Sequence, residues 1–251
     1  MNRRFLYLVE RNFLVWRKLL VPSLIANLAD PLIYLLGLGF GLGALVGNVD
    51  GRPYSTFLAG GMLCYSTLNS ASAEALYSAF SRLKVQRTWE GILHAPMTIT
   101  DVVVGEWLWA AAKATLSGVA ILAVMYGFGF ARGVAPLAVL PVLFVVGLCF
   151  SGVALIMTTL ARGYDFFTYY FTLLITPMGF LSGVFFPLHQ LPGPVQRLAW
   201  LLPLAHAASL ARGLTLGDAM ARPWLSVAVL LGYGVAGVCL AAWIARRRLT
   251  K

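Results

Sequence analysis

The sequence predicts an all-α integral membrane protein with six transmembrane helices. Of its 251 residues, 60% are hydrophobic and 11% are charged, whereas soluble domains average roughly 45–50% apolar and about 25% charged residues. Apolar stretches recur along the chain, and a helix that crosses a bilayer needs about 20 such residues. So little charge cannot cover the surface of a water-soluble fold of this size.

The predicted spans are the apolar segments of crossing length. They cover residues 22–46, 54–79, 107–131, 136–160, 166–187 and 224–245. An even number of spans places both termini on one side of the membrane. If that side is the cytoplasm, thirteen Lys and Arg residues are inside and five are outside, which is the excess that cytoplasmic loops carry. We therefore expect both termini in the cytoplasm.

The N-terminal segment, residues 1–20, combines apolar and basic residues before the first span. It contains the run FLYLVERNFLVWRKLL, in which Arg11, Arg17 and Lys18 interrupt an apolar face. Such a pattern is typical of a helix that lies in the cytoplasmic headgroup layer. The alternative is a simple extension of the first span, and the pattern favours neither.

Residues 188–222 separate the fifth and sixth predicted spans. The run LPGPVQRLAWLLP has apolar residues at helical spacing, but prolines at positions 192, 194 and 203 bracket them. This stretch is too broken to span and too apolar for a free loop. We expect short helices that re-enter or lie in the outer leaflet, because irregular backbone at membrane depth persists only where protein or a cavity covers it.

The longest polar segment on the predicted inner side is the loop of residues 81–106. It mixes Arg82 and Glu90 with apolar residues such as Trp89, and Pro96 is expected to end a short helix within it. A small amphipathic helix with aromatic and arginine anchors is typical of an element that docks on another protein. A helix that lies flat on the bilayer is the alternative.

Two motifs in this order resemble the ABC-2 type permease family. The run RTWEGILHAPMTITDVVVGEW, residues 87–107, is similar to the family's cytoplasmic loop, and FLSGVFFPLHQLPGPVQRLAWLLPLAHAASLAR, residues 180–212, is similar to its signature after the fifth span. The details RTWEG, Tyr164-Asp165 and ITPMGFLSGVFFP resemble the NodJ-type nodulation-factor (lipo-chitooligosaccharide) exporter permeases. The resemblance extends over essentially the whole chain, as one transmembrane domain of residues 1–251.

The resemblance implies the permease subunit of an ATP-binding-cassette exporter in the bacterial inner membrane. It implies a second copy of the permease, surrounding membrane lipids and two copies of an ATP-binding-cassette ATPase, into whose cleft the cytoplasmic loop inserts. The matching residues are Arg87, Trp89, Glu90, Gly91, Leu93 and Pro96. The implied substrate is amphipathic, in the first place a lipo-oligosaccharide; hydrophobic drugs and polysaccharide are the alternatives.

Other function classes fit the residues less well. The chain has no GxxxxGK[ST] motif with which to cradle nucleotide phosphates, so ATP and Mg²⁺ are expected on the partner and no cofactor on this chain. Its three histidines and nine acidic residues show no catalytic or metal-type spacing. This pattern argues against an intramembrane lipid-modifying enzyme, which needs convergent acid, base or metal groups. No polar stripe lines a span, as a passive channel would need. The basic residues lie between spans rather than along one face, and this distribution argues against nucleic-acid binding.

Glu74 and Lys113 are ionisable residues within predicted spans, where charge is costly and marks either pairing or function. Both lie roughly 10 Å from the cytoplasmic end of their span, at ~1.5 Å per residue. We expect a structural ion pair between the second and third spans, with a proton relay as the lesser alternative. Exchange of the two charges is expected to restore an assembly that either single reversal loses.

Asn27 and Asp30 precede Pro31 in the first predicted span. One explanation is local, because proline frees a backbone carbonyl and a nearby polar side chain can compensate. The functional alternative places Asn27 and Asp30, together with Asn69 and Ser72 of the second span, along a substrate route between two permease copies.

Overall fold

The computed structural model describes residues 3–220 and 222–249, apart from the side chains at positions 24, 26–28, 30, 31 and 249. With η for short 3₁₀ or π segments, the helices are α1 (Phe5–Trp16), η1 (Arg17–Leu19), α2 (Leu20–Tyr34), η2 (Leu35–Leu42), α3 (Gly43–Val46), α4 (Tyr54–Ala73), η3 (Glu74–Ser78), η4 (Ser81–Val85), α5 (Thr88–Leu93), α6 (Ile99–Gly127), η5 (Ala135–Val139), α7 (Leu140–Leu160), α8 (Phe166–Tyr169), η6 (Tyr170–Ile175), α9 (Thr176–Leu181), η7 (Leu188–Gln190), α10 (Gly193–Ala199), α11 (Pro203–Leu216) and α12 (Pro223–Leu249). Strands β1 (Asn48–Val49) and β2 (Arg52–Pro53) form a small antiparallel hairpin.

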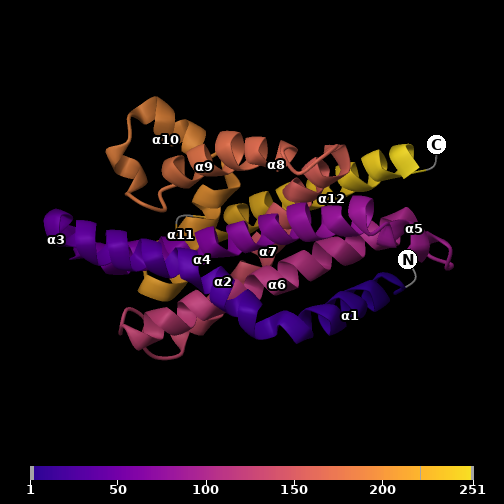
Figure 1. Cartoon of the computed structure of the whole chain (residues 1–251). Helices are drawn as coiled ribbons and strands as arrows, with labels where there is room; N and C mark the ends of the chain where they lie inside the picture. Colours follow the sequence, from indigo (N-terminus) through magenta and orange to yellow (C-terminus); the bar gives the residue numbers. More distant parts are fainter. Residues whose placement is uncertain (1–2, 221, 250–251) are drawn as a thin grey trace.

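The helices lie alongside one another in an elongated bundle, which agrees with the predicted all-α class (Figure 1). α1 begins and α12 ends at the same end of this bundle, close to α5. α3 and α10 lie at the opposite end. The two ends of the bundle therefore carry different elements, and the candidate site lies toward the end that holds α5.

Three helices of the described residues are long and apolar enough to cross a membrane, namely Ile99–Gly127, Ala135–Leu160 and Pro223–Arg248. They coincide with the third, fourth and sixth predicted spans. Leu32–Val46 and Phe166–Leu181 are shorter apolar helices within the first and fifth predicted spans. The six-span topology itself remains a prediction.

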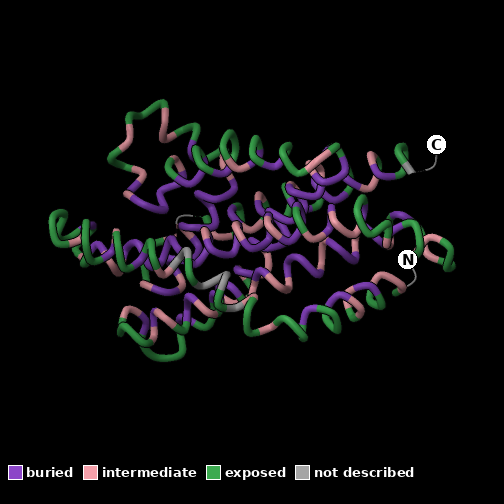
Figure 2. The backbone as a smooth tube through the Cα atoms, in the orientation of Figure 1, coloured by how far each residue is buried: buried purple, intermediate pink, exposed green. Residues whose placement is uncertain are grey.

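α4, which begins the second predicted span, occupies the centre of the bundle. It packs against α6, α7 and α11, and Figure 2 shows most of its length as buried. Two of its buried hydroxyls have partners inside the bundle: Ser66 Oγ lies 3.0 Å from Ser117 Oγ on α6, and Thr67 donates to the Leu63 carbonyl. Hydrogen bonding removes the cost of burying these hydroxyls, so a helix of modest hydropathy lies inside the protein.

α1 packs along α6, and a glycine makes the contact possible. Leu8 is buried there, and a Cβ atom at Gly105 would lie 2.8 Å from the Leu8 Cβ. The chain changes direction where η1 leads into α2 (Figure 1). α1 is thus a helix with its own direction, and its place in the headgroup layer remains a prediction.

The predicted third span begins at residue 107, but α6 already begins at Ile99. A capping box starts the helix: Thr98 Oγ1 accepts from the Asp101 backbone N–H, and Asp101 Oδ2 accepts from the Thr98 N–H. With 29 residues, α6 is roughly 44 Å long at ~1.5 Å per residue, more than the ~30 Å of the hydrocarbon core. The segment 81–106 is therefore largely helical rather than an open loop.

The segment 188–222 contains short helices, as its prolines predict. α10 lies at the end of the bundle away from α5 (Figure 1), and α11 packs against α4, where Cys64 Sγ lies 3.2 Å from the Ala207 carbonyl oxygen. Most residues of α11 are buried. Re-entry of this segment into the membrane remains a prediction.

Candidate functional site

α5 is a single short helix held at a sharp turn. Arg87 precedes it with a left-handed backbone (φ 49°), which separates it from η4. A long side chain such as that of arginine rarely adopts this conformation without support from the surrounding structure. The Arg4 guanidinium donates to the Pro96 carbonyl and so ties the turn after α5 to the start of α1.

One side of α5 is anchored and the other is exposed. Trp89 is 1% exposed, and its Nε1 donates to Glu106 Oε1 at 3.3 Å. Leu93 is half-buried. The exposed residues are Arg87, Glu90, Gly91 and Pro96. The arrangement joins an accessible surface to the inside of the bundle through one indole.

The Trp89 indole reaches a group of four charged side chains, Glu74, Arg82, Glu106 and Lys113, which we call the charge cluster. Arg82 contacts Glu106 through two hydrogen bonds, Nε–Oε1 at 2.8 Å and Nη2–Oε2 at 2.6 Å. Its Nη2 also lies 2.9 Å from Glu74 Oε1. Lys113 Nζ lies 2.7 Å from Glu74 Oε2. Two carboxylates and two cations thus balance one another. Glu74 and Arg82 come from η3 and η4, which follow α4 along the chain, and Glu106 and Lys113 come from α6.

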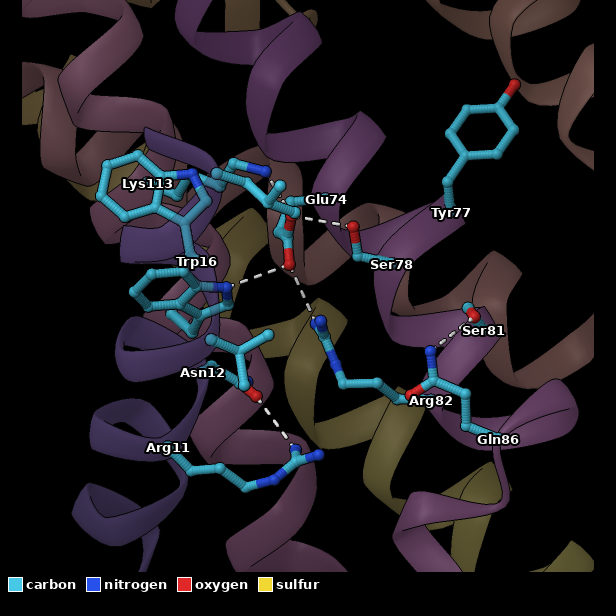
Figure 3. A pocket seen from close by; sticks show the side chains of 13 residues that line it. Arg11, Asn12, Trp16, Glu74, Tyr77, Ser78, Ser81, Arg82, Gln86 and Lys113 are labelled. Atoms are coloured by element: carbon cyan, nitrogen blue, oxygen red, sulfur yellow. Dashed lines mark hydrogen bonds and ion pairs between the residues drawn. The ribbon is translucent and has the colours of Figure 1, made fainter. Parts of the chain in front are cut away.

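Uncharged donors complete the hydrogen bonding of both carboxylates. Glu74 also accepts from Trp109 Nε1 at 3.0 Å and from Ser78 Oγ at 2.9 Å, and Asn12 of α1 donates to Glu106. Figure 3 shows Lys113, Ser78 and Arg82 converging on Glu74, while Tyr77 points away. Such saturation fixes the positions of both carboxylates and removes the cost of burying their oxygens without partners.

The position of Arg82 also stabilises its charge. Arg82 lies just beyond the predicted second span, and its side chain is 14% exposed. Burial acts to lower the pKa of the guanidinium, but the carboxylates of Glu106 and Glu74 outweigh burial and raise this pKa above its ordinary value. Arg82 therefore stays a cation that joins the two carboxylates.

A cavity of about 410 Å³ opens beside the charge cluster, between α1, the segments η3 and η4, and α6. Arg11 and Trp16 of α1 line one side, and Glu74, Arg82 and Lys113 line the other (Figure 3). The cavity separates α1 from the charge cluster except where Asn12 bridges them.

The structure brings together the predicted partners Glu74 and Lys113, but the sequence interpretation missed Arg82 and Glu106. The spacing carried a signal for both. Glu106 lies seven residues before Lys113, on the same face of α6, and Arg82 continues the stripe of Glu74 and Ser78 at intervals of four.

Four-way pairing changes the expected result of charge exchange. In the double variant Glu74→Lys/Lys113→Glu, the new lysine would face Arg82, whose Nη2 lies 2.9 Å from the present Glu74 carboxylate. Like charges at this depth repel strongly. We expect the double variant to remain impaired in folding yield, as judged by size-exclusion chromatography of the purified protein. Full recovery would show that Lys113 alone balances Glu74.

Two of the four candidate route residues, Asn69 and Ser72, have side chains that the structure describes. The side chains of Asn27 and Asp30 lie outside the described residues. Asn69 is half-buried and donates to the Tyr65 carbonyl, and Ser72 is fully buried with its Oγ 3.0 Å from the Tyr170 hydroxyl. Ser72 therefore packs inside this copy of the chain.

Helices of spanning length and a buried charge cluster that leads to an exposed short helix define a multi-pass helical membrane protein. A family model described as ABC-2 type transporter matches residues 3–216. The chain therefore belongs to the ABC-2 type transporter family.

Individual relatives extend the similarity over nearly the whole chain. Nodulation protein J of Rhizobium meliloti (strain 1021) is 46% identical over 240 residues, 96% of this chain and 92% of that protein. Nodulation protein J of Rhizobium leguminosarum bv. viciae is 46% identical over 242 residues, 96% of this chain and 93% of that protein. The inner membrane transport permease YadH of Escherichia coli (strain K12) is 26% identical over 201 residues, 80% of this chain and 77% of that protein.

Proposed function

We propose that this chain is the transmembrane permease subunit of an ATP-binding-cassette exporter that moves a lipo-oligosaccharide out of the cytoplasm or the inner leaflet. Its membrane is the bacterial inner membrane, with both termini in the cytoplasm. A second copy of the permease and two copies of a separate ATPase, which binds ATP and Mg²⁺, complete the transporter. The similarity to nodulation proteins J and to an inner membrane transport permease supports this proposal.

The observation that carries the proposal is the connection from α5 to the bundle. The outer face of α5, with Arg87, Glu90 and Gly91, is accessible to a partner. Its inner face passes through Trp89 to Glu106, and from there through Arg82 to Glu74. A push on α5 therefore acts on α4 and α6 together, and packed helices respond to such a push as rigid bodies.

The substrate route is proposed to run between the two permease copies, past Asn27 and Asp30 of the first span and Asn69 of the second. Ser72, which packs against Tyr170, supports the wall of this route. A groove between apolar helices with few fixed charges suits a ligand that has a lipid part and a polar part.

The Asp30→Asn variant tests this route. We expect it to lower the rate of lipo-oligosaccharide export by roughly tenfold, which corresponds to about 1.4 kcal/mol, while the variant assembles normally. The measurement is uptake into inverted vesicles, with co-purification of the ATPase as the assembly control. Unchanged transport would favour the local role of Asp30 beside Pro31.

Purification from membranes tests the function as a whole. The chain is expected to purify with an ATPase, and vanadate-sensitive ATP hydrolysis in reconstituted vesicles is expected to require this chain. A preparation that recruits no ATPase, while the chain is folded and in the membrane, contradicts the proposed function.

A further inference from the structure

A polar pocket lies at the end of the bundle opposite α5. It has a volume of about 340 Å³ and is bounded by the turn of the β1–β2 hairpin, the loop after α9, α10 and α11. Figure 1 places α10 far from α5 and from the two ends of the chain. Under the proposed topology this is the outer side of the membrane, so we call it the outer pocket.

A buried arginine forms the inner wall of the outer pocket. Arg212 is 9% exposed; its Nη2 donates to the Val184 carbonyl at 2.9 Å, and its guanidinium lies 3.7 Å from the centre of the Phe57 ring. α4 leaves space for it, because a Cβ at Gly61 would lie 2.9 Å from Arg212 Nη2 and 2.7 Å from the Val184 oxygen. The wall is therefore built from three separate segments around one fixed cation.

A second feature of this wall is a hydroxyl without a partner. Ser182 lines the outer pocket and is 1% exposed, and its Oγ has no hydrogen-bond partner among the described residues. A buried polar atom of this kind costs free energy unless something satisfies it. The chain therefore leaves the hydrogen bonding of this part of the wall incomplete.

The rim of the outer pocket has the side chains that bind sugars. Trp200 is 46% exposed, and its flat indole suits the C–H face of a pyranose ring. Asp50 and Asp218 line the pocket, and ionised carboxylates are the side-chain acceptors that sugar hydroxyls can donate to. Gln196 is held in place because its Nε2 donates to the Leu191 carbonyl at 2.7 Å.

The charges of the outer pocket favour a neutral ligand. The carboxylates of Asp50 and Asp218 face the same space as the Arg212 guanidinium, so an anion would meet two like charges. Arg52 lies 3.0 Å from Asp218 and offsets one of them. His189 also lines the pocket, and its Nε2 lies 3.8 Å from Asp50 Oδ1. An aromatic face beside acceptors, an imidazole and a buried guanidinium matches a polyhydroxylated neutral molecule better than a phosphate.

We infer that the outer pocket binds a sugar unit of the exported lipo-oligosaccharide as the substrate leaves on the outer side. This inference rests on the proposed export function and gives that function a saccharide-binding site far from α5. The bound sugar stacks on Trp200 and donates its hydroxyls to Asp50 and Asp218.

Calorimetric titration of the permease–ATPase complex in lipid nanodiscs with chitotetraose, the β-1,4-linked tetramer of N-acetylglucosamine, tests the inference. Trp200→Ala is expected to weaken binding roughly tenfold by removing the aromatic face. Asp50→Asn is expected to weaken it several-fold; asparagine keeps the size of the side chain and tolerates the left-handed backbone there (φ 51°). The matched control is Trp224→Ala, because Trp224 is 84% exposed and lies outside the outer pocket.

Saturable binding that Trp200→Ala and Asp50→Asn weaken, and Trp224→Ala does not, supports the inference. If Trp200→Ala fails to fold, Asp50→Asn decides alone. No binding to the unaltered complex overturns the inference, and so does equal affinity in a folded Asp50→Asn variant. ATPase recruitment is scored during purification, before reconstitution, and permease that recruits no ATPase is titrated alone in nanodiscs. Recruitment without sugar binding overturns only the outer pocket, whereas sugar binding by permease that recruits no ATPase keeps the pocket and contradicts the proposed export function.

Discussion

Arg82→Met is expected to destabilise the folded protein by about 3–5 kcal/mol, which is the usual cost of removing one partner from a buried charge pair. Arg82 contacts Glu106 and Glu74 at once. Without it, Glu106 keeps the uncharged donors Asn12 and Trp89, while Glu74 still has its ion pair with Lys113. The loss therefore falls mainly on Glu106.

Thermal unfolding of the purified permease in detergent measures this effect, together with the yield of monodisperse protein. Lys84→Met is the matched control, because Lys84 is a cation two positions away on the same segment and is exposed. The control should unfold at the temperature of the unaltered protein. Equal stability of the Arg82→Met and Lys84→Met variants would show that the charge cluster does not hold α4 and α6 together.

The positions of many helices could be predicted because the hydropathy of a segment indicates whether lipid and protein or water surround it. Apolar runs mark the helices Ala135–Leu160 and Pro223–Arg248 closely. The early start of α6 also had a local signal, since Thr98 and Asp101 have the spacing of a capping box. The hairpin turn at Asp50-Gly51 also had a local sequence signal, because an Asp-Gly pair favours the left-handed backbone that both residues adopt.

The sites depend on contacts between distant segments, and for these the sequence carried less information. Glu74 and Lys113 could be paired from their depth alone, but depth does not show that Arg82 and Glu106 share the same contacts. The positive-inside rule uses position along the chain, so it places Arg212 among the five external Lys and Arg residues. Its burial against Phe57, 155 positions away, depends on how α11 packs on α4.

Glu90→Arg is expected to abolish ATPase recruitment and export while leaving the permease as stable as before. Glu90 lies on the exposed face of α5, whereas the anchor of that helix is Trp89. The substitution therefore reverses a charge on the proposed docking surface and leaves the charge cluster intact. Reversal of a charge in a docked surface commonly costs several kcal/mol because it brings like charges together, enough to lower affinity by more than a hundredfold.

Co-purification of the ATPase and vanadate-sensitive hydrolysis measure the effect of Glu90→Arg. Glu10→Arg is the matched control, an exposed glutamate on α1 that has no proposed contact with the ATPase. Because Arg82→Met acts on the bundle and Glu90→Arg acts on its surface, the first should lower the unfolding temperature and the second should not. Full ATPase recruitment by the Glu90→Arg variant would move the docking surface away from α5, whereas loss of recruitment at unchanged stability would locate it there.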